Sequence, residues 1–212
     1  MIDVTGSARP LEGRAIGVLI ESDYYEPEIA YYQHRFPEEG AETRFLTRLW
    51  GQASLTFTGH EYRAPLVCDT DFESDMEAVL DSLAAVIIPS GMVADRLRYT
   101  DDVGVLPPAT EFLRRAFARP DLLKGIICHG LWLVAPLPEL VRGRHVVAHN
   151  NLHGDVQNMG AIYVDSDVVV DGDLVTARTG AHCHQFARTI IDLLSGRPPV
   201  FAPDARIPAL AG

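Results

Sequence analysis

The sequence is poor in cysteine, and the few cysteines it has are widely spaced. Its 212 residues include three, which are Cys68, Cys128 and Cys183. A small domain held together by disulfides has a larger and even number of cysteines. We therefore expect free thiols, a reducing compartment such as the cytoplasm, and at least one cysteine that is available for chemistry.

Clusters of positive charge and long apolar segments are also missing. Eighteen Lys and Arg stand against 29 Asp and Glu, so the formal net charge is −11, which disfavours binding to a phosphate backbone. The longest apolar runs have about six residues, far short of the roughly 20 that span a bilayer. The opening MIDVTGSARPLEG has no apolar signal core. We expect no nucleic-acid partner and no membrane partner.

What the sequence does have is a regular alternation of short apolar runs and longer helical patterns. Strands are predicted over 14–20, 42–48, 84–89, 125–128 and 144–149. A short hairpin with a following strand is predicted over 53–69, and a hairpin that turns on Asp171-Gly172 over 167–177. Helices are predicted over 27–40, 72–82, 109–118, from 129 to about 136, and over 184–194. This order predicts an α/β fold with a mostly parallel sheet covered by helices on both faces.

The expected organisation is one domain over 14–198, with a flexible lead-in at 1–13 and a tail at 199–212. Ligands of such sheets bind at the carboxyl ends of the strands. Three predicted loops leave those ends, at 21–28, 89–98 and 128–130. The candidate site should lie where these loops meet.

The segment GIICHGLWLVA, residues 125–135, places a thiol and an imidazole between a strand and a helix. Cys128 is either a small buried hydrophobic residue or a nucleophile on a strained turn. The flanking Gly125 and Gly130 fit a crowded turn. The start of a helix would lower the pKa of the Cys128 thiol and favour the thiolate. The nucleophile is the interpretation we favour.

Two further loops supply partners for such a nucleophile. In IIPSGMVADRL the amide of Gly91, with that of His129, would form an oxyanion hole, and Asp95 is a carboxylate that could orient an imidazole. Glu28 opens the first predicted helix. It is either a charged residue stabilised at the helix start or, if buried against Cys128, a protonated carboxyl that bonds to the sulfur.

Taken together, these segments resemble the ThiJ/PfpI superfamily, in particular its PfpI-type intracellular cysteine proteases. The resemblance covers about residues 14–195. It rests on EIAYYQHRFPEEG (28–40), VIIPSGMVADRLR (86–98), ICHG (127–130) and DVVVDGDLVTAR (167–178). It implies a flavodoxin-like three-layer sandwich with a small β-hairpin, and a homo-oligomer, either a dimer or a hexamer. No cofactor is expected.

The resemblance also implies roles for individual residues. Cys128 would be the nucleophile with His129 as its partner, and Glu28 would contact the cysteine. Gly91 takes the oxyanion position. Asp95 stands where the family has a glutamate that completes the site from a neighbouring subunit, but it is one methylene shorter.

Further departures from the family pattern are visible. Ser90 replaces the first glycine of a Pro-Gly-Gly loop, Leu131 replaces the proline of the elbow, and the segment 98–108 is unlike the proteases and could form a lid. A lid would suit a small closed pocket.

Histidines are frequent late in the chain. His149 and His153 have helical spacing, but no compact metal-binding motif accompanies them, and we expect no metal. The candidates for a substrate-pocket wall are His182, His184 and Arg178.

The function predicted from these features is a cysteine-dependent enzyme that attacks an electrophilic carbonyl of a small molecule or peptide. A peptidase-like or deglycase-like hydrolase is the first reading. A glyoxalase-type or hydratase-type lyase is an alternative within enzymes. A redox sensor that acts through oxidation of Cys128 is an alternative outside enzymes.

Overall fold

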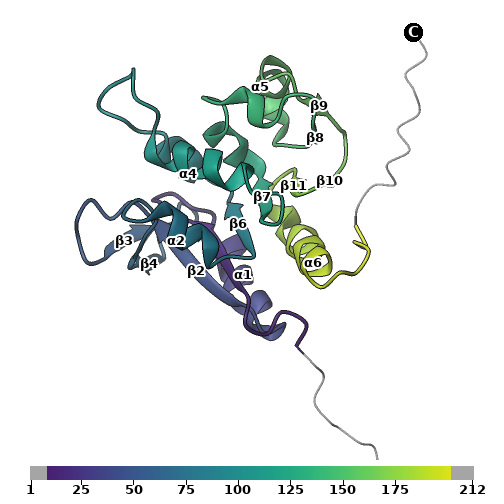
Figure 1. Cartoon of the computed structure of the whole chain (residues 1–212), viewed down its shortest axis with the longest axis horizontal. Coiled ribbons are helices and arrows are strands. Elements are labelled where there is room, and N and C mark those ends of the chain that lie inside the picture. Colours follow the sequence, from purple (N-terminus) through teal and green to yellow (C-terminus); the bar gives the residue numbers. More distant parts are fainter. Residues whose placement is uncertain (1–8, 202–212) are drawn as a thin grey trace, which may run out of the picture.

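The fold is described from a computed structural model, over residues 9–201. Its centre is a seven-stranded sheet in which every neighbouring pair is parallel except β10 with β11, at one edge (Figure 1). In spatial order the strands are β10 (Val168–Asp171), β11 (Leu174–Ala177), β7 (Leu123–Ile127), β6 (Ala85–Ile88), β1 (Ala15–Leu19), β2 (Glu42–Thr47) and β5 (Thr70–Asp71). Two small sheets pair β3 (Leu55–Thr58) with β4 (Pro65–Cys68), and β8 (His145–Val146) with β9 (Ile162–Tyr163).

Helices cover both faces of the sheet, as the sequence predicted. The α-helices are α1 (Glu26–Glu38), α2 (Met76–Asp81), α3 (Val93–Leu97), α4 (Pro108–Phe117), α5 (His153–Asn158) and α6 (Cys183–Leu194). Short 3₁₀ helices are η1 (Cys128–Leu133), η2 (Pro138–Leu140), η3 (Asn150–Leu152) and η4 (Gly180–His182). Helices α1 and α6 pack together on one face, and α2, α3, α4 and η1 contact one another on the other (Figure 1). The molecule is a flavodoxin-like three-layer sandwich.

The inner strands form because their sequences are apolar on both faces. All five residues of β1 are buried, and so are all four of β6 and all five of β7. A strand that is covered on both sides has a continuous apolar run and no alternation. At Gly17 in β1, a Cβ would lie 2.7 Å from side-chain atoms of both Leu46 and Leu83, so a larger residue would have to push these two side chains aside.

The chain departs from the predicted elements in several places, and short elements such as η2, α5 and β9 were not predicted. The late hairpin turns on Gly172 and Asp173, because Asp171 still pairs with Leu174 in the ladder and Gly172 supplies the positive φ of +57°. The predicted helix after Cys128 is a 3₁₀ helix that ends at Leu133. The strand predicted over 144–149 is reduced to two residues, and the segment 93–97 adds a short helix.

The predicted lead-in and tail lie largely outside the described residues. Within the described part, residues 9–13 form a turn that packs on the domain. Leu11 is fully buried, and its N–H donates to the carbonyl of Glu39 at 2.9 Å. The packed domain therefore begins before residue 14. None of the helices in residues 9–201 is long and apolar enough to cross a membrane.

Candidate functional site

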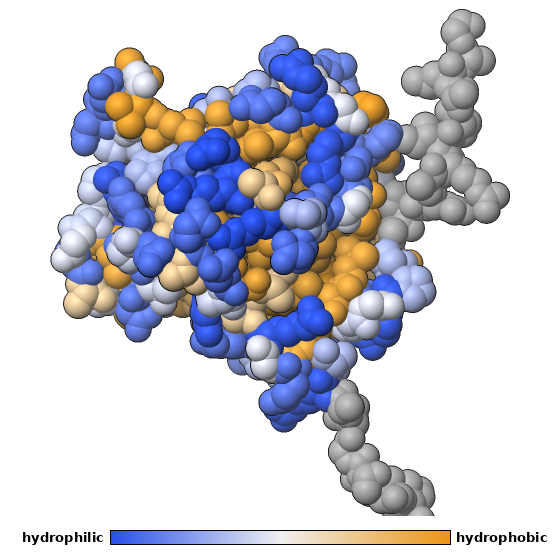
Figure 2. Space-filling model, viewed as in Figure 1, coloured by the Kyte–Doolittle hydropathy of each residue, from blue (hydrophilic) through white to orange (hydrophobic). Residues whose placement is uncertain are grey.

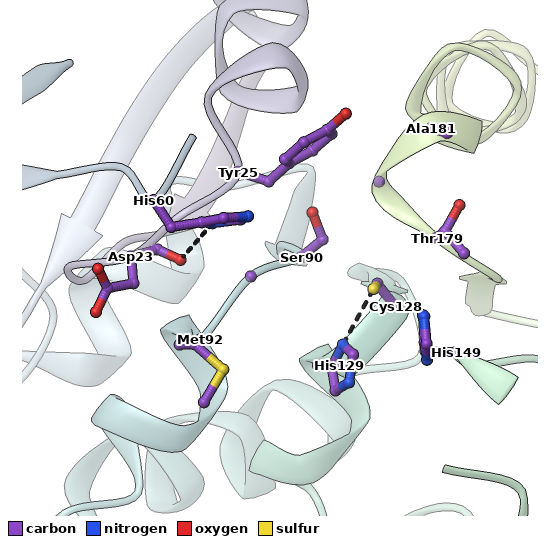
Figure 3. A pocket seen from close by; sticks show the side chains of 12 residues that line it. Asp23, Tyr25, His60, Ser90, Met92, Cys128, His129, His149, Thr179 and Ala181 are labelled. Carbon is purple, nitrogen blue, oxygen red and sulfur yellow. Dashed lines mark hydrogen bonds between the residues drawn. The ribbon is translucent and has the colours of Figure 1, made fainter. Parts of the chain in front are cut away.

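A cavity of about 490 Å³ opens at the carboxyl ends of the inner strands (Figure 3). The chain reverses its direction of winding between β1 and β6, and this is the point where open α/β sheets bind ligands. Loops after β1, β6, β7 and β11 all contribute to the wall. Its lining residues are Asp23, Tyr25, His60, Ser90, Gly91, Met92, Cys128, His129, His149, Thr179, Gly180 and Ala181.

Cys128 lies where β7 ends and η1 begins, with φ at +60°. A non-glycine residue in this region stores about 1–3 kcal/mol of strain, which the surrounding packing must sustain. Part of that packing is Gly130, where a Cβ would lie 2.7 Å from the carbonyl oxygen of Ile88. The chain therefore runs too close to β6 for any larger residue, and the thiol is held at the cavity with 8% of the residue exposed.

The electrostatics of this thiol differ from the sequence expectation. Burial raises the pKa of Cys128 to about 11, and the charge of Glu28 adds to the rise. Hydrogen bonds from the backbone N–H groups of Gly180, His129 and Gly91 lower this pKa, but by less than burial raises it. The expected lowering by a helix start was wrong, because η1 is one short 3₁₀ segment and the sulfur is largely withdrawn from water.

Those three amides form a cradle around the sulfur, and glycine is required at two of them. Gly91 has φ at +85° and pairs with Tyr24 in an isolated bridge, and a Cβ on it would overlap the carbonyl oxygen of Asp23. At Gly180 a Cβ would overlap the ring of Tyr25. Preorganised N–H groups of this kind stabilise an oxyanion. Gly91 could be predicted from the sequence because it directly follows an apolar strand, whereas Gly180 lies in no recognisable motif.

Beside the sulfur, two histidines form a stack. Nδ1 of His129 lies 3.2 Å from Sγ of Cys128. The ring of His149 lies over that of His129 with centroids 4.6 Å apart and planes 27° apart (Figure 3). Burial lowers the pKa of His129, and the neighbouring His149 lowers it further. A neutral imidazole in contact with a thiol can accept its proton.

Glu28 is fully buried behind the cradle, in the first turn of α1. Its Oε2 accepts hydrogen bonds from the backbone N–H of Ser90, at 3.0 Å, and from the Ser90 hydroxyl. Burial raises the pKa of this carboxyl to about 7, against the lowering effect of the Ser90 hydroxyl. The expected bond between the carboxyl and the sulfur is not formed among the described residues, and Oε1 has no hydrogen-bond partner.

The opposite wall comes from residues that the sequence did not single out. The ring of His60, from the loop between β3 and β4, stacks on Tyr25 with centroids 5.7 Å apart. Its Nδ1 lies 3.2 Å from the carbonyl oxygen of Asp23. Buried Glu26 fixes this loop by accepting the backbone N–H groups of Glu61 and Tyr62, both at 2.9 Å. No sequence motif indicates this role of His60, because a single histidine in a turn has no characteristic spacing to other residues.

The three residues predicted for the pocket wall do not line the cavity. Arg178 donates to Asn150, Tyr163 and Asp165. His182 bonds to Thr179 and faces Asp167, and His184 is exposed and bonds to the carbonyl of Ala181. The η4 turn directs both histidine side chains away, so the prediction for all three was wrong. From this part of the chain, Thr179, Gly180 and Ala181 line the cavity instead.

Asp95 and the predicted lid also lie away from the cavity. Asp95 is an exposed residue of α3 and lines a separate surface groove with Trp50 and Tyr99. The loop 98–107 projects from the body beside α4 (Figure 1), and its apolar surface is visible in Figure 2. Val103 at its tip is fully exposed. Within one chain this loop does not cover Cys128.

No group of three or more His, Cys, Asp or Glu side chains is placed to hold a metal ion in residues 9–201. His149 and His153 do not share a helix face: His149 precedes η3, while His153 opens α5 and packs edge-on against Tyr163. Cys68 and Cys183 are free, buried thiols, and burial raises their pKa values to about 11 and about 12.

Several known proteins are similar to this chain in sequence. A protein/nucleic acid deglycase of Escherichia coli (strain K12) is 29% identical over 182 residues, which are 85% of this chain and 98% of that protein. A deglycase of Pyrococcus abyssi is 28% identical over 179 residues, 84% of this chain and 98% of that protein.

A solved structure from Anabaena variabilis superposes with a TM-score of 0.75 at 26% identity. That protein contains a DJ-1/ThiJ/PfpI-like domain and a ferritin-like domain, and the match covers 90% of this chain and 50% of that one. The model of the DJ-1/PfpI family matches residues 14–193. The chain therefore belongs to the DJ-1/PfpI family.

Proposed function

We propose that this protein is a cysteine-dependent hydrolase that attacks an electrophilic carbonyl carbon, with deglycase-like activity on carbonyl-modified amines as the leading form. The observation that carries the proposal is the arrangement at Cys128. A strained thiol at a cavity of about 490 Å³ has an imidazole nitrogen at 3.2 Å and three backbone N–H groups around it. The similarity to deglycases supports the same chemistry.

In the proposed reaction the substrate is an amine modified by a 2-oxoaldehyde, that is, a hemiaminal next to a ketone. Sγ of Cys128 forms a bond to the former aldehyde carbon, the carbon–nitrogen bond breaks, and the thiol proton passes through His129 to the leaving amine. His129 then takes the proton of this hydroxyl-bearing carbon, and the neighbouring ketone oxygen becomes an oxyanion that accepts hydrogen bonds from the amides of Gly91, His129 and Gly180. The proton returns to the former ketone carbon, which leaves a thioester of a 2-hydroxy acid. Water adds to the thioester carbon, the carbon–sulfur bond breaks, and the thiol regains its proton.

We further propose that the protein is a homo-oligomer in which Asp95 meets His129 of another subunit. Asp95 is exposed, and within one chain it does not reach the cavity, so such a contact needs a second copy. Native mass spectrometry gives the oligomeric state of the wild type, and turnover of the wild type and of Asp95→Asn tests the contact. A monomeric wild type, or an Asp95→Asn variant with unchanged turnover, would contradict the proposal.

The experiment for the reaction compares the wild type, Cys128→Ser and the control Cys68→Ser, which removes a buried thiol far from the cavity. The panel is a fluorogenic peptide, an aryl ester, methylglyoxal and an amine modified by methylglyoxal. We expect release of the free amine by the wild type and by Cys68→Ser only. Turnover of methylglyoxal alone would identify a lyase, and a gain of two oxygens at Cys128 under peroxide with no turnover would identify a sensor. Either result overturns the hydrolase.

A further inference from the structure

The buried carboxyl behind the nucleophile is held by a residue that no part of the proposed reaction uses. Ser90 is 1% exposed and lies at the end of β6. Its backbone N–H and its hydroxyl both donate to Oε2 of Glu28. Both hydrogen-bond donors of Ser90 therefore bond to the same carboxyl oxygen, Oε2 of Glu28.

The other oxygen of that carboxyl has no hydrogen bond of normal geometry, although the nearby Tyr32 hydroxyl also lowers the pKa of Glu28, by less than the Ser90 hydroxyl does. Oε1 of Glu28 is buried without a hydrogen-bond partner, and so is the hydroxyl of Tyr32, one turn later in α1. The titratable groups that face Glu28 are Cys128 from η1, Cys183 from α6, and Tyr32 and Tyr25 from α1 and the residue before it. All of them are acids, so no cation in the described residues competes with Ser90 for the carboxylate.

We propose that Ser90 is a positioning residue that keeps the single negative charge of this cluster on Glu28 and off Cys128. With one proton removed, the cluster has two forms. One is a carboxylate with a thiol, and the other is a carboxylic acid with a thiolate. A hydroxyl that donates to Oε2 stabilises only the first. Ser90 thus restrains the nucleophile by lowering the fraction of thiolate at Cys128.

The inference rests on the proposed nucleophilic role of Cys128, but its test needs no turnover. In Ser90→Ala the backbone N–H and the Cβ remain and only the hydroxyl is lost. The charge should then shift toward the thiolate, and Cys128 should react faster with iodoacetamide between pH 7 and 9. Each unit by which the thiol pKa falls raises the thiolate fraction tenfold but lowers its nucleophilicity about threefold, so the net gain is about threefold per unit.

The decisive control is a double-mutant cycle with Glu28→Gln. If Ser90 acts through the carboxyl, Ser90→Ala should accelerate alkylation in the wild-type background and have no effect in the Glu28→Gln background. Thr189→Ala serves as the matched variant, because it also removes a buried hydroxyl, one that donates to the carbonyl of Gln185 in α6. That variant should alkylate like the wild type.

A residue with a merely structural role would give a different result. Alkylation of Ser90→Ala that follows the wild-type pH profile, or that changes equally in both backgrounds, would overturn the inference. If instead the cycle behaves as expected while Cys128→Ser keeps full turnover, the inference stands and the proposed function fails. The two failures are therefore separable.

Discussion

The imidazole of His149 lies 4.6 Å from that of His129, centroid to centroid, and the backbone N–H of His149 donates to the carbonyl of Cys128 at 3.3 Å. The nucleophile elbow is thus braced by a residue from a separate segment of the chain. His129 is also packed edge-on against Trp132, at 4.9 Å. The ring that is placed to accept the thiol proton is therefore held by an indole ring and by a second imidazole.

This stack makes the protonation of His129 depend on His149. Burial lowers the pKa of His129 first, and the like charge of His149 lowers it further. In His149→Phe the flat ring remains but the charge is gone, so the pKa of His129 should rise. Titration of the His129 ring by NMR measures it, with His153→Phe as the control. An unchanged or lower pKa in His149→Phe would show that burial alone sets the value.

Glu28 makes the stability of the fold depend on pH in an unusual direction. Burial raises its pKa from 4.5 to about 7 in the folded chain, so the folded state binds its proton more tightly than the unfolded state. This contribution is complete below pH 4.5 and is lost as pH rises through about 7. Relative to Glu28→Gln, the wild type should lose roughly 3 kcal/mol of unfolding free energy across this window.

Urea unfolding at pH 5 and pH 8 of both proteins tests this, since other titrating groups cancel in the difference. Glu26→Gln is the matched control. The Glu26 carboxyl is also buried, but hydrogen bonds from Glu61 and Tyr62 hold its pKa below 4.5 despite burial, so its contribution changes only at lower pH. A wild-type curve parallel to that of Glu28→Gln would mean that Glu28 is ionised in the folded protein throughout.

The sheet and the nucleophile elbow could be predicted from the sequence because each depends on residues that are adjacent in the chain. The buried strands are uninterrupted apolar runs, and Cys128, His129 and Gly130 are adjacent in one motif. Gly91 could be found for the same reason, because it follows an apolar strand directly. Each of these features needs only the information within a short window.

The rest of the cavity depends on tertiary packing, which no short segment of the sequence reveals. His60 reaches the site only because Glu26 fixes its loop, and Gly180 only because β11 lies beside β7. The pKa of Cys128 was predicted with the wrong sign because burial, which decides it, is a property of the whole fold. Arg178 illustrates the reverse error. The resemblance of its hairpin to that of the family suggested the site, but its side chain turns to Asp165.

The amide of Gly180 should be more sensitive to substitution than its distance in sequence from Cys128 suggests. In Gly180→Ala the new methyl group would overlap Tyr25 and lie 2.7 Å from Oγ of Ser90, so the η4 turn must shift. Loss of one oxyanion donor typically lowers kcat by about 10²–10³-fold. Gly154→Ala is the control, since nothing lies within 4 Å of its Cβ. Turnover of the modified amine within threefold of the wild type would contradict a role for this amide.

Arg178 should matter for stability and not for turnover. Its guanidinium joins Asn150, Tyr163 and Asp165, and so ties the segment that carries His149 to the end of β11. The bond to Tyr163 is partly buried and the bonds to Asn150 and Asp165 are exposed, so their loss in Arg178→Ala should cost about 1 kcal/mol. At a temperature where the variant is folded, kcat and KM should equal those of the wild type, because the side chain is absent from the cavity wall. Thermal unfolding and steady-state kinetics on one preparation give both numbers. A raised KM with an unchanged Tm would return Arg178 to the substrate site.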